Sequence, residues 1–396
     1  MNYGVVAEFN PFHNGHKFLI DSIKKEESDT VTAVMSESFV QRGECACESP
    51  YARTLSALEN GVDLVLSLPV PYATASAERF AQGGVGTLAS LGCIDTLAFG
   101  SESGNAEVLR KCAEAITSEE FSPMLENRLN EGLSFPTARQ RALRDMFGDE
   151  FADALISPND ILGVEYIKAI NAGGYDIDVL PLKRTGVGHD SKETAENICS
   201  ASALRNMMKS ETDFKNFLPG KSLEILNKEI SEKRAPADFS KLETAILYKL
   251  RTMTVEELRN IPDVSEGLEY RIKESVKTAV TVDEILEKIK TKRYTHSRLR
   301  RIALCSLLGI TKRDARTAIP YIRVLGFNKK GAGVLKAAKK TAVLPIVTKS
   351  SDLAYLDEDA KHFFELECRT RDIFALTLPK TDVCGREMTD KIIVLE

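Results

Sequence analysis

The sequence predicts an α/β protein with a Rossmann-like, doubly wound parallel sheet and a mainly helical C-terminal domain. Two observations lead to this fold. Short apolar runs alternate with segments of helical periodicity over the first half of the chain, which is typical of parallel strands joined by crossover helices. From about residue 213 the alternation stops, and amphipathic helical segments follow.

The first strand–loop–helix unit carries the clearest functional signal. Residues 3–7 form a short apolar run that suits a buried parallel strand, and residues 17–24 have helical spacing. The loop between them contains His13 and His16, with Gly15 between the two. A helix N-terminus offers unpaired N–H groups and a partial positive charge, and a glycine lets a phosphate approach the backbone. The unit therefore predicts phosphate binding.

The two histidines of this loop lie about one helical turn apart, so both rings can face one ligand. Imidazole N–H groups can donate to phosphoryl oxygens as negative charge builds at an α-phosphate, without a covalent intermediate. The alternative is a capped helix with two ordinary histidines. The position of the motif after the first strand of an α/β pattern favours nucleotide binding.

Four further strands are predicted, at residues 31–35, 63–68, 96–99 and 178–182. Helical segments at residues 53–60 and 75–91 separate the earlier strands, and residues 103–156 have the pattern of a helical insertion. This order predicts right-handed crossovers, with ligands bound beyond the carboxyl ends of the strands.

Several candidate residues follow the predicted strands. Arg42 could bind a phosphate or a carboxylate, or could be a solvated loop residue. Gly100 could let a nucleotide lie against the backbone. Asn159 could cap a helix or contact a base or ribose. Arg184 and Thr185 begin a basic, glycine-containing loop that suits pyrophosphate.

The C-terminal half is markedly basic. Across residues 288–340 Asp314 is the one acid among many Lys and Arg residues, with aromatic residues interleaved. A solvated helical face is the alternative, but this density favours contact with a nucleic-acid backbone. We expect a catalytic domain over residues 1–212, a basic helical RNA-binding domain over residues 213–341, and a segment over residues 342–396 that packs back on the body.

Composition excludes some classes of protein. The 396 residues are 43% hydrophobic and 28% charged, as in a globular protein, and the net charge of −5 argues against a uniformly basic nucleic-acid binder. No apolar run approaches the ~20 residues of a membrane span, and no signal peptide is apparent. The eight cysteines form no CxxC pair, which argues against zinc and disulfides and favours a cytoplasmic protein.

The motif of residues 13–16 resembles the HxGH signature of the nucleotidyltransferase superfamily. The longer string of residues 8–16, EFNPFHNGH, is more specific and resembles the bacterial tRNA-Met cytidine acetate ligases. The resemblance continues in order through residues 34–44, 61–65, 99–102, 158–163, 183–190 and 293–301. It departs at Pro50, where the family carries a lysine.

The resemblance implies that ATP and acetate form acetyl-adenylate, and that the exocyclic amine of the wobble cytidine of elongator tRNA-Met then takes the acetyl group. Mg²⁺ is expected to bridge the phosphates. The catalytic residues implied are His13, His16, Arg42, Ser202 and Arg205, of which Ser202 and Arg205 would hold the pyrophosphate. The nucleotide-binding residues implied are Val6, Ala7, Glu8, Phe9, Asn10, Pro11, Phe12, His13, Asn14, Gly15, His16, Lys17, Phe18, Leu19, Gly100, Asn159, Arg184 and Thr185. The anticodon arm would contact Arg293, Tyr294, His296, Arg298, Arg300 and Arg301.

Two other functions remain open at this point, and so does the oligomeric state. A small-molecule adenylyltransferase would explain the histidine motif but would leave the long basic module unused. A non-catalytic nucleotide- or RNA-binding protein of the same fold would bind ATP without releasing pyrophosphate. The departure at Pro50 is the feature that motivates this last alternative.

Overall fold

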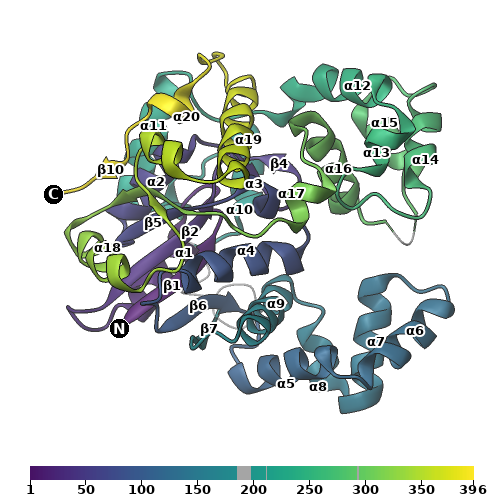
Figure 1. The fold of residues 1–396 in the computed structure, drawn as a ribbon, viewed down its shortest axis with the longest axis horizontal. Coiled ribbons are helices and arrows are strands. Elements are labelled where there is room, and N and C mark those ends of the chain that lie inside the picture. Colours follow the sequence, from purple (N-terminus) through teal and green to yellow (C-terminus); the bar gives the residue numbers. More distant parts are fainter. Residues whose placement is uncertain (185–197, 211, 292–293) are drawn as a thin grey trace.

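The computed structural model describes residues 1–184, 198–210, 212–291 and 294–396. Within these ranges the central sheet has the strand order β10-β8-β5-β2-β1-β6-β7, with β9 beside β8 (Figure 1). Its strands are β1 (Asn2–Ala7), β2 (Thr30–Ser36), β5 (Leu64–Leu68), β6 (Thr96–Ser101), β7 (Asp178–Lys183), β8 (Ile322–Phe327), β9 (Ile346–Val347) and β10 (Ile393–Val394). All five predicted strands are present, so the predicted α/β class is confirmed.

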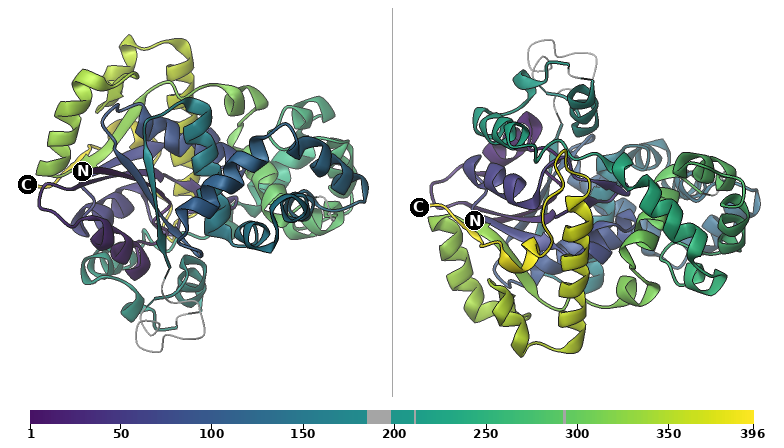
Figure 2. Two further views of the ribbon diagram at one scale, coloured as in Figure 1. Left: turned by 90° about the horizontal axis from the view of Figure 1, so that it is seen from below. Right: turned by 90° about the horizontal axis from the view of Figure 1, so that it is seen from above.

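Helices cover both faces of this sheet (Figures 1 and 2). Leu64 and Leu66 of β5 pack toward one face and Val65 toward the other, as the period of two in a strand requires. On the Val65 side lie α1 (Asn14–Ile23) and α2 (Pro50–Glu59), and on the other side lie α4 (Ala77–Ala89), α9 (Pro158–Gly173) and α18 (Lys329–Thr341). Because both faces are covered, the inner strands β2 and β5 are buried at every residue.

The strand order places a topological switch point at β1. This strand pairs in parallel with β2 on one side and with β6 on the other, and β2 pairs in parallel with β5. The chain therefore builds one half of the sheet before crossing to the other half. In open α/β sheets ligands bind outside the carboxyl ends of the strands at such a point. The carboxyl end of β1 leads directly into the histidine loop.

Two groups of helices extend from the sheet on the right of Figure 1. The insertion between β6 and β7 begins with α5 (Ala106–Thr117), α6 (Phe121–Asn130), α7 (Phe135–Phe147) and α8 (Asp149–Ala154). The other group, the helical domain, comprises α12 (Glu243–Thr252), α13 (Val255–Arg259), α14 (Leu268–Ser275), α15 (Val282–Ile289), α16 (His296–Leu308) and α17 (Lys312–Arg316). Its hydrophobic cluster includes Leu258, Leu286 and Leu304, and also takes in Phe39 and Phe374 from outside this group of helices.

The remaining elements join these parts. They are α3 (Val70–Ala73), α10 (Ala201–Lys209), α11 (Gly220–Ser231), α19 (Glu358–Ala375), α20 (Arg386–Thr389) and the short strands β3 (Phe39–Val40) and β4 (Glu44–Cys45). Helix α19 packs against α3 and α16, and so connects the sheet to the helical domain. In the described part of the chain no helix is long and apolar enough to cross a membrane.

The basic stretch of residues 288–340 does not form one helical unit, which differs from the sequence-based expectation for residues 213–341. Strand β8 lies antiparallel to β5 in the central sheet, and α18 packs against β2 and β5. Its cations are therefore divided between α16 and α17 on one side of the molecule and α18 on another (Figure 1). Residues of β8 alternate between buried and half-buried, as in a strand. This period of two could be read from the sequence, but the many positive charges around it favoured a helical interpretation.

Candidate active site

The loop from Glu8 to His16, here called the His loop, joins β1 to α1. Phe9 and Phe12 are fully buried beneath it, with their ring centroids 4.9 Å apart. Phe9 has a φ of 44°, a left-handed conformation that is costly for an aromatic residue and that concentrates at functional sites. The side chain of His13 caps α1, because its Nδ1 accepts a hydrogen bond from the Gly15 N–H at 3.0 Å.

The two histidine rings stack on each other, with centroids 3.8 Å apart and planes 20° from parallel. The His13 backbone N–H donates to Nδ1 of His16 at 3.2 Å, just as the Gly15 N–H donates to Nδ1 of His13. An Nδ1 that accepts carries no proton, so in the neutral ring the proton is on Nε2. Each imidazole therefore presents an Nε2–H donor to a ligand.

Burial keeps both rings neutral. Loss of solvation, with a smaller contribution from the nearby Arg184 and Arg205 guanidinium groups, lowers the pKa of His13 to about 4. Burial also lowers the pKa of His16 well below its usual value. A Cβ at Gly15 would lie 2.9 Å from Cε1 of His13, so glycine is required for this ring position. The pair can donate hydrogen bonds at neutral pH without carrying charge.

The structure brings Ser202 and Arg205 to the His loop from α10, far along the chain. Arg205 donates to the Asn10 carbonyl oxygen at 2.9 Å and to Oγ of Ser202 at 3.3 Å. Ser200 caps α10 by accepting from the Ala203 N–H. A guanidinium and a hydroxyl at a helix N-terminus suit a phosphate group.

The carboxyl ends of β6 and β7 form the other wall of the site. Gly100 lies against the side chain of Arg184, whose Cγ would be 3.4 Å from a Cβ at that position. Asn159 is not the cap of α9, because Ser157 precedes that helix and Glu102 accepts hydrogen bonds from its first turn. The Asn159 amide donates to Glu102 at 2.6 Å, which fixes its orientation.

Arg42 lies in the turn between β3 and β4, and its side chain is exposed. The next residue, Gly43, has a φ of 74°, and a Cβ there would lie 2.7 Å from the Arg301 backbone nitrogen of α16. Glu44 follows and pairs with Arg300 at 2.8 Å and with Arg205 at 3.9 Å. The hairpin therefore connects the His loop region to the helical domain.

The other predicted nucleotide-binding residues differ in how accessible their side chains are. Val6 packs beneath Gly84 of α4, and Leu19 packs into the sheet core, so neither side chain faces solvent freely. Lys17 pairs with Asp21 on the surface of α1, and Phe18 is 44% exposed. A nucleotide would contact the backbone, rather than the side chains, of the buried residues in the His loop. Thr185 lies outside the described residues.

The predicted RNA-contacting residues are partly used within the protein. Tyr294 is buried, and the Arg298 guanidinium lies 4.9 Å from its ring centroid. Arg298 donates to the Asp263 carbonyl oxygen, and Arg301 pairs with the Asp263 carboxylate at 2.8 Å. His296 and Arg300 also have partners, Glu287 at 3.3 Å and Glu44 at 2.8 Å, but their side chains are 40% and 42% exposed. Arg293 lies outside the described residues.

Two residues near the site were not among those predicted. Arg53, fully buried, donates to the carbonyl oxygens of Glu8, Ser36 and Glu48, and so holds together the ends of β1 and β2. Glu44 joins Arg205 to Arg300, as described above. The Gly43 that precedes Glu44 is a turn signal that could have indicated the hairpin. No local sequence pattern predicts that Arg53 donates to three carbonyl oxygens.

Comparison with known proteins agrees with this geometry. The family model described as HIGH Nucleotidyl Transferase matches residues 1–389. The tRNA(Met) cytidine acetate ligases of Acetivibrio thermocellus and Caldanaerobacter subterraneus are 38% and 39% identical, with 99% of each chain covered in both cases. A crystal structure of Thermotoga maritima TmcAL bound with alpha-thio ATP superposes with a TM-score of 0.91 at 34% identity, covering 100% of this chain and 99% of that one.

These similarities extend over both the sheet and the helical domain. The apo form of the Thermotoga maritima protein gives a TM-score of 0.92 with the same coverage. The His loop lies at the switch point of the sheet, and both relatives named above are tRNA(Met) cytidine acetate ligases that match 99% of this chain. The chain therefore belongs to the HIGH nucleotidyl transferase family and, within it, to the tRNA(Met) cytidine acetate ligases.

Proposed function

We propose that this protein activates acetate with ATP and transfers the acetyl group to the wobble cytidine of elongator tRNA-Met. In the first step an acetate oxygen attacks the α-phosphorus, pyrophosphate leaves, and acetyl-adenylate forms. In the second step the exocyclic amine attacks the acetyl carbonyl carbon and AMP leaves. The amine is a weak nucleophile because its lone pair is delocalised into the ring, and the mixed anhydride compensates for this.

The observation that carries the proposal is the pair of neutral, stacked histidines, each with Nε2–H as its donor. Donors fixed in advance stabilise charge that develops in a transition state, and here the charge would develop on α-phosphate oxygens. Arg205 and Ser202 lie on one side of the His loop, where the leaving pyrophosphate would be held. Gly100, Asn159 and Arg184 on the other side would contact the nucleoside.

Mg²⁺ is proposed to enter with the nucleotide. This ion binds mainly through phosphate and water oxygens, so it does not need a cage of protein ligands. In the described ranges of the chain no three His, Cys, Asp or Glu side chains are grouped as metal ligands.

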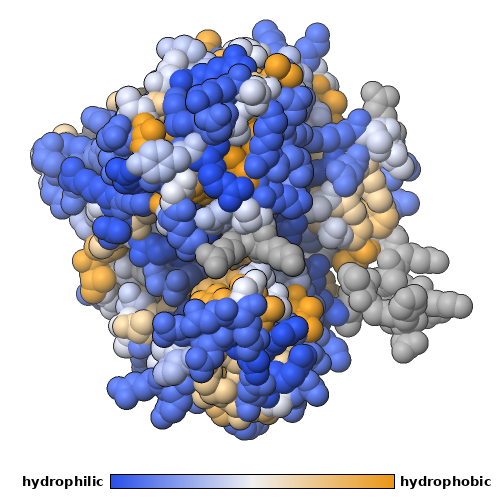
Figure 3. All heavy atoms as spheres, turned by 90° about the vertical axis from the view of Figure 1, so that its right-hand side faces the viewer, coloured by the Kyte–Doolittle hydropathy of each residue, from blue (hydrophilic) through white to orange (hydrophobic). Residues whose placement is uncertain are grey.

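The helical domain would dock the anticodon arm. Its surface is mainly hydrophilic on the face that Figure 3 shows, in the upper half of the view. His296 and Arg300, whose side chains are partly exposed on α16, are the candidates for RNA contact among the predicted residues. Because tRNA would be the substrate, we also propose a cytoplasmic location.

The experiment that tests this function is ATP–pyrophosphate exchange, measured with and without acetate and in the absence of tRNA. Exchange that requires acetate supports adenylation of that carboxylate, and transfer of labelled acetate to tRNA-Met then tests the second step. The absence of exchange both without and with tRNA, for any carboxylate, would contradict the proposal and favour a non-catalytic binding protein.

A further inference from the structure

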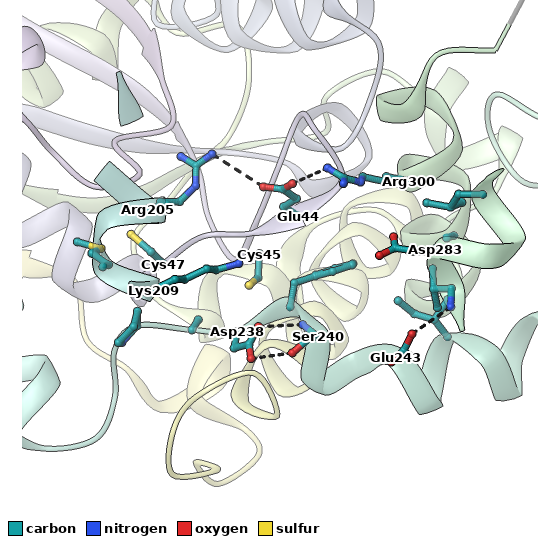
Figure 4. A pocket seen from close by; sticks show the side chains of 18 residues that line it. Glu44, Cys45, Cys47, Arg205, Lys209, Asp238, Ser240, Glu243, Asp283 and Arg300 are labelled. Atoms are coloured by element: carbon teal, nitrogen blue, oxygen red, sulfur yellow. Dashed lines mark hydrogen bonds and ion pairs between the residues drawn. The ribbon is translucent and has the colours of Figure 1, made fainter. Parts of the chain in front are cut away.

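A cavity of about 300 Å³ lies between the β3–β4 hairpin, α10 and the helical domain (Figure 4). Its walls come from both sides of the molecule: Arg205 and Lys209 from α10, and Asp283 and Arg300 from α15 and α16. This volume is at the lower end of the range for small-molecule sites. It is large enough for one nucleoside and too large for acetate alone.

The cavity adjoins the site of adenylation. Arg205 lines it and also donates to the Asn10 carbonyl oxygen of the His loop. Glu44 lies at the same end, paired with Arg205 and Arg300 (Figure 4). A molecule in the cavity would therefore have one end beside Arg205, next to the position that pyrophosphate leaves before acetyl transfer.

The lining is amphipathic. Cys45 and Ile246 contribute apolar surface, and Phe239 contributes an aromatic ring. Lys209 and Asp283 project into the cavity in Figure 4, and within the described residues neither forms a hydrogen bond or an ion pair. Apolar walls with a few convergent polar groups are characteristic of a small-molecule site.

Other acids of the lining are already occupied. Asp238 accepts from the backbone N–H and the hydroxyl of Ser240, at 3.1 and 2.7 Å. Glu243 accepts from the Val282 N–H at 3.1 Å. These contacts hold the cavity wall in place. They leave Lys209, Asp283 and the Glu44 end as the groups that can recognise a ligand.

We propose that this cavity receives the cytosine nucleoside that is to be acetylated, an inference that rests on the proposed function. Enzymes that modify a base draw it out of its stack into a pocket and read its edge by hydrogen bonds. Glu44 would accept a hydrogen bond from the exocyclic amine, Lys209 would donate to the ring carbonyl, and Asp283 would accept from a ribose hydroxyl. Uracil would be rejected, because its O4 would face the Glu44 carboxylate.

The acetyl transfer follows from this placement. The amine nitrogen forms a bond to the acetyl carbonyl carbon, and the bond from that carbon to the phosphate oxygen breaks, so AMP leaves with the electron pair. The nitrogen becomes acidic once it is bonded to the carbonyl carbon. Its proton passes to the Glu44 carboxylate.

The test uses Lys209→Met and Asp283→Ala in the full-length protein, because both side chains are exposed and folding should not depend on them. Two rates are measured for each variant: acetate-dependent ATP–pyrophosphate exchange without RNA, and acetyl transfer to a tRNA-Met transcript. The expected result is exchange within about two-fold of the original protein and transfer reduced by about 10-fold or more, since each variant loses one charge-assisted hydrogen bond to the nucleoside.

Matched controls are Lys277→Met and Glu274→Ala, which change charge at an exposed ion pair of the helical domain outside the cavity. Removal of a carboxylate should strengthen the general electrostatic attraction to RNA in both Asp283→Ala and Glu274→Ala. A loss of transfer in Asp283→Ala but not in Glu274→Ala would therefore identify a specific contact. Transfer at the original rate in both cavity variants would overturn the inference. Loss of exchange in them would also overturn it, by assigning the residues to the ATP site. Absence of exchange in the original protein, both without and with tRNA, would instead reject the proposed function.

Discussion

At the scale of single residues, His13 combines a structural and a chemical role. Its Nδ1 caps α1 while its Nε2–H faces the proposed phosphate site. Asparagine is also a good helix cap but has no imidazole donor. We predict that His13→Asn folds and lowers acetate-dependent pyrophosphate exchange by about 10²–10³-fold, the usual cost of removing one donor to developing charge. Exchange at the original rate would exclude His13 from the reaction.

The same variant should change how stability depends on pH. The pKa of His13 is about 4 in the folded protein and close to 6.5 in the unfolded chain. Between these values the unfolded state binds more protons, so the free energy of unfolding falls as pH is lowered, by at most about 1.4 kcal/mol per pH unit. Urea titrations from pH 7 to 4 should show a shallower decline for His13→Asn than for the original protein, and an equal decline would contradict the assignment.

Arg53 provides a second test at this scale. Its guanidinium donates to three carbonyl oxygens from a fully buried position, which a lysine cannot reproduce. We predict that Arg53→Lys lowers the free energy of unfolding by about 2–3 kcal/mol and also slows exchange, because the ends of β1 and β2 lose their common anchor. The exposed Arg110→Lys is the control and should change the urea midpoint little.

At the residue scale the sequence identified the local motifs. The histidine spacing with Gly15 and the serine–arginine pair could be singled out because each is short, and the structure brings them together, while their roles stay predictions. Arg53 and the Glu44 bridge could not, because their partners are brought together only by the folded chain.

At the scale of elements, the β3–β4 hairpin is the contact between the two halves of the protein. Gly43→Ala would combine an unfavourable φ with a Cβ 2.7 Å from the α16 backbone. Gly132→Ala, at a φ of 80° with nothing within 4 Å, carries the first cost without the second. We predict a greater loss of stability for Gly43→Ala, by about 1–3 kcal/mol in thermal unfolding, together with slower acetyl transfer. Equal losses would show that the contact with α16 contributes nothing.

The inner strands and their helices could be predicted from the sequence because buried parallel strands are continuous apolar runs. The hairpin and β8 could not be predicted so readily. The hairpin strands have two residues each, which is too short to show the alternation of apolar and polar residues that identifies a strand. In β8 buried and half-buried residues alternate, but the cations on both sides of this strand made the whole stretch look helical.

At the scale of the whole molecule, the two ends of the chain belong to the same sheet. Ile393 of β10 is buried beside Gly326 of β8, whereas Val394 is 57% exposed. We predict that Ile393→Ala lowers the free energy of unfolding by about 2–4 kcal/mol, the usual cost of a cavity at a buried isoleucine. Val394→Ala on the same strand should cost much less. Equal urea midpoints for the two variants would show that β10 does not stabilise the sheet.

This closure of the sheet has a consequence for folding kinetics. The pairs of β8 join residues that are far apart in the sequence, Leu64 with Phe327 and Ile393 with Gly326. Such long-range strand pairs form slowly, because much chain entropy is lost before their contacts stabilise the fold. Until β10 is in place, residues 326–327 of β8 expose unpaired backbone groups on that side, so aggregation of partly folded intermediates is the failure that this topology favours.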